Sequence, residues 1–215
     1  KLEVSDNTFL TAGVILAGGL ASRMGGGDKT LLNLKGKTIL QRVMDRLSPQ
    51  VDKIVLNANG NPKRFSKYPI VVIPDNINGF LGPLAGVLAG LDWAEENGFH
   101  RIVTVAGDTP FFPVTLVDDL LAALRNSNSR IALASTKPST SKRLLRHPTF
   151  GIWPVDLKED LRKALTDGVR KVVHWTEKHN HIDVLFENNL YDPFFNVNTP
   201  QDLYIAKNRI NLEVK

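Results

Sequence analysis

A glycine-rich segment, LAGGLASRMGGGDK at residues 16–29, directly follows the apolar run GVIL at 13–16. This pattern predicts a loop that opens at the end of a buried strand. Glycines have no Cβ, so they adopt positive-φ turns that other residues avoid and let backbone N–H groups approach an anion. Arg23 and Lys29 add positive charge to the same loop. We therefore expect a cradle for phosphate groups, with glycines at Gly18, Gly19, Gly25, Gly26 and Gly27.

Short apolar runs alternate with helical patterns along most of the chain. Several of these runs are apolar throughout, as in a parallel sheet that is covered on both faces. The order β-α-β-β-α-β-α-β, followed by a less regular final third, predicts an α/β protein. Its expected architecture is a three-layer α/β/α sandwich with a Rossmann-like, mainly parallel sheet. The expected strands are 13–17, 53–57, 70–73, 101–106, 130–134 and 182–186.

Four helices are expected between and after these strands. Apolar residues at helical spacing predict two of them, over 39–47 and 116–124. Pro83 suits the first turn of another helix, which we expect to stop at Gly98. The last helix starts at Thr199-Pro200, with Thr199 as its N-cap.

The length and composition favour one cytoplasmic domain over residues 1–215. No low-complexity or Pro/Ser-rich linker divides the chain. The absence of cysteine excludes disulfides and thiolate metal sites. No apolar stretch approaches the roughly 20 residues needed to span a bilayer. The first residues, KLEVSDNTF, lack the hydrophobic core of a signal peptide, and we expect no membrane contact.

The formal charge of +5 does not by itself indicate a nucleic-acid partner. The 27 basic and 22 acidic residues are spread along the whole chain, with no basic helix and no aromatics interleaved with Lys and Arg. We therefore expect no nucleic-acid binding. The same excess of positive charge steers small polyanionic substrates towards a cleft.

Polar side chains follow three of the expected strands. Asn57 ends one strand, Asp75 follows the next, and Asp108 follows the strand at 101–106. Because parallel strands point their carboxyl ends at one edge, these groups should meet beside the glycine loop. Mg²⁺ is held by one or two carboxylates plus substrate phosphates, and Asp108 is the expected metal ligand. Taken locally, each aspartate also fits a simple turn residue.

The loop matches neither of two common nucleotide-binding motifs. Asp28, and not glycine, precedes Lys29, so the segment is not a GxxxxGK[ST] loop. Its glycines also miss the GxGxxG spacing of dinucleotide-binding proteins, which argues against an NAD dehydrogenase.

A set of motifs spread over most of the chain resembles molybdenum cofactor guanylyltransferases, the MobA family. The loop motif alone is shared with cytidylyltransferases and sugar-phosphate nucleotidyltransferases, whereas the full set in this order is more specific. The resemblance implies the nucleotidyltransferase fold and transfer of GMP from GTP to molybdopterin, with release of pyrophosphate. The motifs are LAGG…RMGGxDK at 16–29, Asn57, Asp75, GPLAG at 82–86, DTP at 108–110, HPT at 147–149 and NVNTP at 196–200.

The resemblance also implies roles for residues in the half that binds the nucleotide, about 13–110. Lys29 and Arg23 would stabilise the triphosphate and the departing pyrophosphate, with Mg²⁺ on Asp108. The Asp75 carboxylate can accept from guanine N1–H and the exocyclic amine together, which a cytosine edge does not offer. The implied nucleotide-binding set is Leu16, Ala17, Gly18, Gly19, Lys29, Asn57, Asp75 and Asp108.

The part implied to bind the acceptor covers about 111–200. His147 is placed near the pterin by resemblance, and Asn196 and Asn198, as alternate strand residues, should face the same side. These asparagines fit substrate contact and helix capping equally well. The basic stretch 137–147 is expected to be a loop, either a mobile flap over the pterin phosphate or a solvated charged segment. Apo-molybdoenzymes or their chaperones are implied as transient partners that receive the product.

Other functions remain open at this point. A CTP-using enzyme that acts on molybdopterin or on a sugar-alcohol phosphate would use the same loop. A nucleotide-sensing module would use the cradle without catalysis, although such a module has no need of the combination of Asp108, Lys29 and Arg23.

Overall fold

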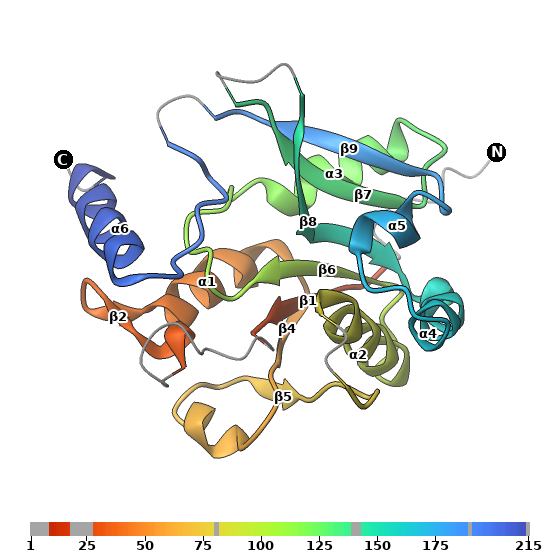
Figure 1. Ribbon diagram of the computed structural model, residues 1–215, viewed down its shortest axis with the longest axis horizontal. Helices are drawn as coiled ribbons and strands as arrows, with labels where there is room; N and C mark the ends of the chain where they lie inside the picture. The colour runs from red at the N-terminus through yellow and green to blue at the C-terminus, as the bar shows by residue number, and fades with distance from the viewer. Residues whose placement is uncertain (1–8, 18–27, 80–81, 139–142, 189–190, 214–215) are drawn as a thin grey trace.

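The computed structural model describes residues 9–17, 28–79, 82–138, 143–188 and 191–213 (Figure 1). Its centre is a seven-stranded sheet in the order β5-β4-β1-β6-β8-β7-β9. Neighbouring strands are parallel, except that β8 runs antiparallel to both β6 and β7. The strands are β1 (Thr11–Leu16), β4 (Lys53–Asn57), β5 (Val71–Ile73), β6 (Arg101–Ala106), β7 (Ile131–Thr136), β8 (Leu145–Pro154) and β9 (His181–Phe186).

Helices cover both faces of this sheet, and a two-stranded hairpin lies beside it. The hairpin consists of β2 (Asn33–Leu34) and β3 (Lys37–Thr38), and short 3-10 turns include η2 (Lys29–Leu31) and η4 (Pro62–Phe65). The helices are α1 (Ile39–Leu47), α2 (Pro83–Glu96), α3 (Leu116–Arg125), α4 (Lys158–Thr166), α5 (Val172–Thr176) and α6 (Pro200–Glu213).

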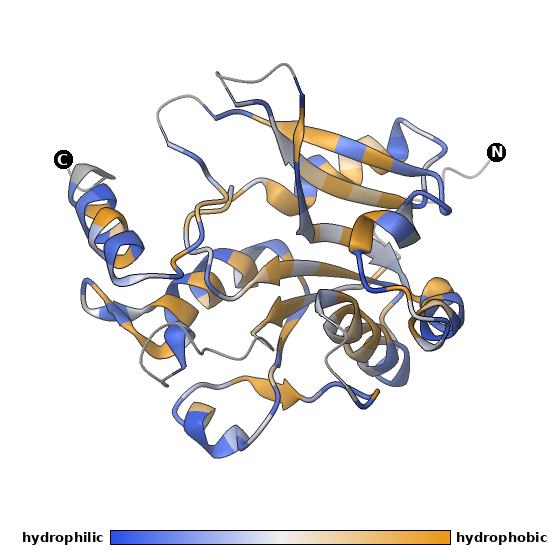
Figure 2. Cartoon of the chain, viewed as in Figure 1, coloured by the Kyte–Doolittle hydropathy of each residue, from blue (hydrophilic) through white to orange (hydrophobic). Residues whose placement is uncertain are grey.

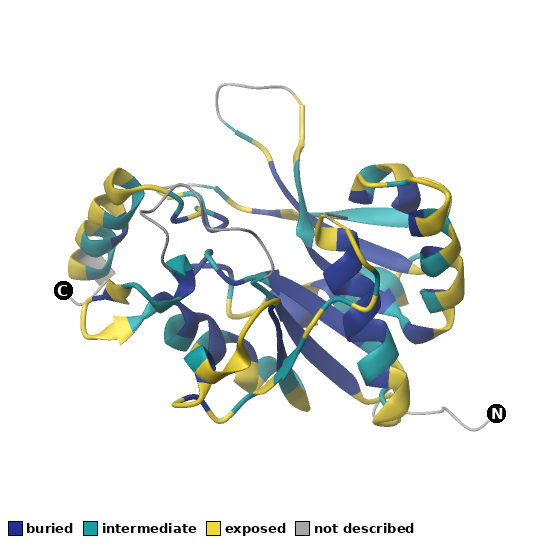
Figure 3. Ribbon diagram, turned by 60° about the horizontal axis from the view of Figure 1, so that its bottom comes forward, coloured by how far each residue is buried: buried dark blue, intermediate teal, exposed yellow. Residues whose placement is uncertain are grey.

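Successive residues of each strand are buried on opposite faces of the sheet. In β1, Ile15 packs with residues of α1 and α3, whereas Val14 packs with residues of α2, α4 and α5. Figure 2 shows the apolar strands between amphipathic helices, and Figure 3 shows the same strands buried beneath helices with exposed outer sides. Apolar residues on both faces of a strand require a covering layer on each face. The predicted three-layer, mainly parallel α/β/α sandwich is therefore confirmed.

The C-terminal helix α6 packs against a small separate cluster at the β2–β3 hairpin. Ala206 of α6 is fully buried there with Leu34 and Val197. The helix begins with a mutual cap, since Asp202 N donates to Thr199 Oγ1 and Thr199 N donates to an Asp202 carboxylate oxygen. Thr199 is thus the N-cap, as predicted.

The six expected strands are all present, with ends shifted by up to two residues. The strand β8 is the main error of the sequence interpretation. Residues 145–147 belong to this strand and not to a loop over 137–147, while residues 139–142 lie outside the described residues. Arg146, His147 and Pro148 suggested a polar loop, but antiparallel pairing with β7, and further along the strand with β6, forms the strand. The last third is also more regular than expected, since it contains α4 and α5.

Within the described ranges, no helix is both long enough and apolar enough to cross a membrane.

Candidate functional site

The carboxyl ends of four parallel strands lie in one row. In the pairing register, Leu16 of β1 lies opposite Asn57 of β4 on one side and Ala106 of β6 on the other. Asn57 in turn lies opposite Ile73 of β5. The residues that follow these ends, including Asp75 and Asp108, therefore emerge at one edge of the sheet, as predicted.

Backbone hydrogen bonds continue beyond the strand ends and tie the row together. Ala17 N donates to Asn57 O over 2.9 Å, and Gly107 N donates to Leu16 O over 2.9 Å. These bonds hold the start of the glycine-rich segment between β4 and β6. Six residues that the sequence assigned to it lie outside the described residues: Gly18, Gly19, Arg23, Gly25, Gly26 and Gly27.

Lys29 joins two other predicted site residues at this edge. Its Nζ donates to Asp108 Oδ2 over 2.6 Å and to Asn198 Oδ1 over 2.5 Å. The lysine side chain is 26% exposed and the aspartate side chain 14%, so the pair remains open to a ligand. The cluster brings a cation, a carboxylate and an amide together from three segments far apart in the sequence.

Asn196 reaches the same cluster through a residue that the sequence interpretation missed. The Thr109 hydroxyl lies 2.6 Å from Asn196 Oδ1 and 3.0 Å from Asp108 Oδ1. The backbone N–H of Val197 donates to Asp108 O over 2.8 Å. Asn196 and Asn198 do face the same side, but they do not lie in a strand, contrary to expectation. The segment that holds both asparagines crosses the end of β6, where Val197 N bonds Asp108 O. This crossing, and not sheet pairing, sets the direction of the two side chains.

Asp28 fixes the backbone that carries Lys29. One carboxylate oxygen accepts from Thr30 N and from the Thr30 hydroxyl, while Arg64 Nε donates to the other over 3.0 Å. Asp28 is thus the N-cap of η2, and its ion pair with Arg64 holds this turn against η4. Asp before a helical turn is a common cap signal, which could have identified it from the sequence.

A second cluster contains Asn57 and Asp75. Asn57 Nδ2 donates to Asp75 Oδ1 over 3.0 Å, and Asn59 Nδ2 donates to Asp75 Oδ2 over 2.8 Å. Asn59 was not predicted from the sequence. It follows β4 by two residues, so the alternation of polar residues after Asn57 was the available signal.

Gly86 lets helix α2 approach this second cluster. A Cβ on Gly86 would lie 2.3 Å from Asn57 Oδ1 and 2.8 Å from Leu16 Cδ2. Contacts this short do not occur between real atoms, so a larger residue requires Asn57 to move. The glycine of GPLAG therefore has a packing role at the site.

His147 lies in a third cluster, on β8. Its Nε2 is 2.8 Å from the Thr136 hydroxyl, and its ring stacks on Phe194 with centroids 4.3 Å apart. Burial lowers the pKa of His147, and the charge of Asp192 opposes this shift. These contacts do not reach Lys29 or Asp108, although Phe194 lies just before the segment that holds Asn196.

Comparison with known proteins assigns the family. Residues 13–182 match the family described as the MobA-like NTP transferase domain. The chain belongs to this family. A protein of Bradyrhizobium named molybdenum cofactor guanylyltransferase is 45% identical over 212 residues, which is 97% of each chain. A protein of the same name from Rhizobium meliloti is 40% identical over 94% of this chain and 93% of its own length.

Solved structures agree on the fold. Molybdopterin-guanine dinucleotide biosynthesis protein A from Archaeoglobus fulgidus aligns with a TM-score of 0.71 at 24% identity, over 94% of this chain and 100% of that one. The 4-diphosphocytidyl-2C-methyl-D-erythritol synthase of Anaerococcus prevotii aligns with a TM-score of 0.73 at 15% identity, over 94% and 96%. These similarities confirm the nucleotidyltransferase fold that was expected for this MobA-like domain.

A divalent metal ion is typical of nucleotidyltransferases, and it requires oxygen ligands at the carboxyl edge of the sheet. Among the described residues, no group of three or more His, Cys, Asp or Glu could hold a metal ion. Asp108 is the carboxylate of the Lys29 cluster. A single carboxylate fits Mg²⁺ that is shared with substrate phosphates and water, and does not fit a cage made only of protein ligands.

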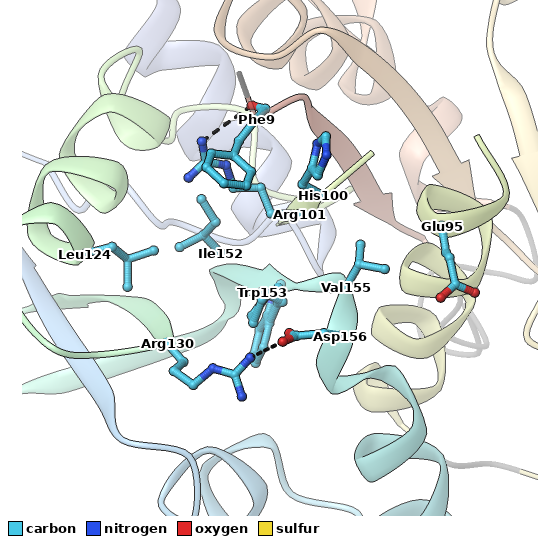
Figure 4. Close-up of a pocket in the computed structure, with 11 residues that line it drawn as sticks. Phe9, Glu95, His100, Arg101, Leu124, Arg130, Ile152, Trp153, Val155 and Asp156 are labelled. Atoms are coloured by element: carbon cyan, nitrogen blue, oxygen red, sulfur yellow. Dashed lines mark hydrogen bonds and ion pairs between the residues drawn. The ribbon is translucent and has the colours of Figure 1, made fainter. Parts of the chain in front are cut away.

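A separate pocket of about 500 Å³ lies at the other edge of the sheet (Figure 4). It is lined by the first residue of β6, Arg101, and the last residue of β8, Pro154, among others. None of the predicted site residues that the structure describes lines it. The pocket is therefore distinct from the candidate site of this MobA-like domain.

Proposed function

We propose that this protein is a guanylyltransferase that transfers GMP from GTP to molybdopterin and forms the guanine dinucleotide cofactor. The names of relatives about 45% identical over nearly the whole chain support this substrate pair. The observation that carries the chemistry is the contact of Lys29 Nζ with both Asp108 and Asn198 at the carboxyl edge. No observation on the described residues favours a CTP-using enzyme or a nucleotide sensor.

In the proposed reaction, a phosphate oxygen of molybdopterin attacks the α-phosphorus of GTP in line. A bond forms between that oxygen and the α-phosphorus, and the bond from the α-phosphorus to the bridging oxygen breaks. Its electron pair leaves with pyrophosphate. The nucleophile is already anionic, so no general base is needed and the protein acts by positioning and charge stabilisation.

Lys29 supplies the positive charge in this proposal, together with Arg23 from the glycine-rich loop. The Asp28 cap and the Asn198 amide hold Lys29 at the strand ends, where the triphosphate is expected. Removal of one such electrostatic group commonly lowers the rate by about 10²–10³.

Asp108 would hold Mg²⁺ in this site, together with phosphate oxygens and water. The cation, when bound, neutralises phosphate charge and orients the triphosphate. The role of Asp108 in this chain is to present a carboxylate at the end of β6. Lys29 and the Thr109 hydroxyl fix the orientation of that carboxylate.

The base is proposed to lie at the Asn57 cluster, within a nucleotide-binding half over about 13–110. Asp75 would accept from guanine N1–H and the 2-amino group at once. Leu16, Ala17, Gly18 and Gly19 would contribute backbone groups to the nucleotide.

The acceptor is proposed to lie against about 111–200 of the same domain, which covers 1–215. His147, Asn196 and Asn198 would contact the pterin half, and Asn198 would also hold Lys29. We further propose that the protein works in the cytoplasm. Apo-molybdoenzymes or their chaperones would receive its product in transient contacts.

The test is pyrophosphate release from each of the four nucleoside triphosphates, with molybdopterin and Mg²⁺. We expect turnover with GTP and none with CTP. A thermal-shift series should show stabilisation by GTP that rises with ligand concentration. Turnover with CTP and not with GTP would reject the guanylyl assignment. Stabilisation by GTP without turnover would favour the sensing module.

A further inference from the structure

Asn59 makes a two-point contact with Asp75. Asp75 N donates to Asn59 Oδ1 over 2.9 Å, while Asn59 Nδ2 donates to Asp75 Oδ2 over 2.8 Å. A backbone N–H can only donate, so the first bond fixes which end of the asparagine amide faces it. The NH₂ group is thereby directed at the carboxylate.

The two oxygens of Asp75 each have one amide donor. Asn57 occupies Oδ1 at 3.0 Å, and Asn59 occupies Oδ2. A carboxylate oxygen accepts about two hydrogen bonds, so the described residues leave one site free on each oxygen. Rotation of the carboxylate plane would break one of the two amide bonds. The pair of asparagines therefore sets the direction in which both free sites point.

Asn59 is itself held in place, although it is exposed. Arg64 Nη2 donates to Asn59 O over 2.7 Å, and Arg64 Nη1 donates to Asn61 O over 2.7 Å. Arg64 Nε also pairs with Asp28, the cap of the turn that carries Lys29. Arg64 therefore links the position of Asn59 to the turn that carries Lys29. The Asn59 side chain links it to Asp75.

We propose that Asn59 is a positioning residue that sets the preference for guanine by aligning the Asp75 carboxylate. This inference rests on the proposed function, in which Asp75 accepts from two adjacent donors of guanine. Two parallel hydrogen bonds require the carboxylate plane to match the base edge, whereas a single bond tolerates rotation. Loss of the Asn59 amide therefore weakens recognition of the second guanine donor, the 2-amino group, more than recognition of N1–H.

The experiment compares GTP with inosine triphosphate, whose base keeps N1–H and lacks the 2-amino group. The readout is the ratio of kcat/KM for the two nucleotides, measured for the full chain with molybdopterin and Mg²⁺. In Asn59→Ala, we expect this ratio to fall by about tenfold, mostly through the KM for GTP, as for the loss of one oriented hydrogen bond. Asn59→Asp keeps the shape and replaces the donor by a carboxylate oxygen, so the ratio should fall at least as far.

Asn76→Ala is the matched control, because Asn76 is a nearby exposed asparagine whose side chain bonds Asp92 and not Asp75. Its ratio should equal that of the wild-type protein. A general loosening of the loop would lower both kcat/KM values equally and leave the ratio intact. An unchanged ratio in Asn59→Ala and Asn59→Asp, with wild-type melting temperatures, would overturn the inference.

Asp75→Asn separates this inference from the proposed function. If Asp75→Asn loses the preference for GTP while both Asn59 variants keep it, only the role of Asn59 is rejected. If Asp75→Asn keeps the preference, Asp75 does not recognise the base and both proposals on base recognition fail.

Discussion

Lys29 Nζ lies 2.6 Å from Asp108 Oδ2, although 79 residues separate the two in the sequence. The lysine begins η2, and the aspartate follows β6. The pairing of β1 with β6 and the backbone bond from Gly107 N to Leu16 O bring these two segments to the same edge. Opposite charges at this spacing hold each other in place before a substrate binds, so the site is organised in advance for a charged ligand.

Asp108→Asn tests the charge of this cluster with little change of shape. We expect pyrophosphate release to fall by about 10²–10³, because the amide cannot replace an ionised carboxylate at a divalent cation. The melting temperature should change little, since a partly exposed ion pair contributes only about 0–1 kcal/mol. Lys29→Met should give a similar loss of rate. Near-normal turnover in Asp108→Asn would contradict the metal role.

Asn198 is expected to act through Lys29. Asn198→Ala removes the second acceptor of the ammonium group, and we expect kcat/KM for GTP to fall by about tenfold. Asn198→Asp places a second carboxylate beside Lys29 and should weaken triphosphate binding further, because it adds negative charge where the phosphates are proposed to bind.

Steady-state kinetics with varied GTP checks this order of effects. The Asp variant should also gain more activity than the Ala variant from raised Mg²⁺, since the cation offsets the added charge. If Asn198→Asp binds GTP as well as the wild-type protein, the cluster does not face the triphosphate.

Local signals were enough to predict the sheet edge. The strands at 53–57 and 101–106 have the predicted bounds, because each is a short apolar run buried on both faces. The rule that parallel strands end at one edge then placed Asn57 and Asp108 together. The strand β8 was missed because its first residues, Leu-Arg-His-Pro, carry no strand pattern of their own. Its first residues are held by pairing with the preceding strand β7, and its last residues by pairing with the distant strand β6.

The contacts within the site were also beyond local patterns. Asn198 meets Lys29 across 169 residues, which neither spacing nor propensity can show. Thr109 stands beside Asp108, yet only the hydrogen bonds of the folded chain separate it from an ordinary turn residue. For Asn59, the polar alternation after Asn57 was the one sequence signal.

The stability of the protein is expected to fall in mild acid through His147. Burial lowers the pKa of this side chain below its ordinary value of 6.5, and the opposing charge of Asp192 does not cancel the shift. The unfolded chain therefore binds a proton at His147 more tightly than the folded chain does. Protonation below about pH 6.5 thus favours unfolding. The contribution of neutral His147 is fully present above that pH and declines as the pH falls.

Urea unfolding between pH 5 and pH 8 measures this dependence. His147→Gln cannot titrate, so its free energy of unfolding should depend less on pH than that of the wild-type protein. His174→Gln makes the same substitution at an exposed position of α5 and serves as the reference variant. A wild-type pH dependence in His147→Gln would show that other groups cause the acid sensitivity.

Gly86→Ala is expected to disturb nucleotide binding through packing alone. The added Cβ would lie 2.3 Å from Asn57 Oδ1, so Asn57 must shift, and its bond to Asp75 shifts with it. Overpacking of this kind costs about 1–3 kcal/mol of stability. We also expect the KM for GTP to rise by roughly tenfold, since the carboxylate proposed to bind the base loses one of its two positioning bonds.

Gly90→Ala provides the matched comparison on the same helix. Its Cβ would lie 2.8 Å from Val14 Cγ2, within the apolar core of the same face, and its three nearest atoms all belong to Val14 and Ile102. Both variants should lower the melting temperature, but only Gly86→Ala should raise the KM for GTP. Because the two substitutions add the same methyl group to one helix, an equal KM in both would mean that Asn57 has no part in holding the nucleotide.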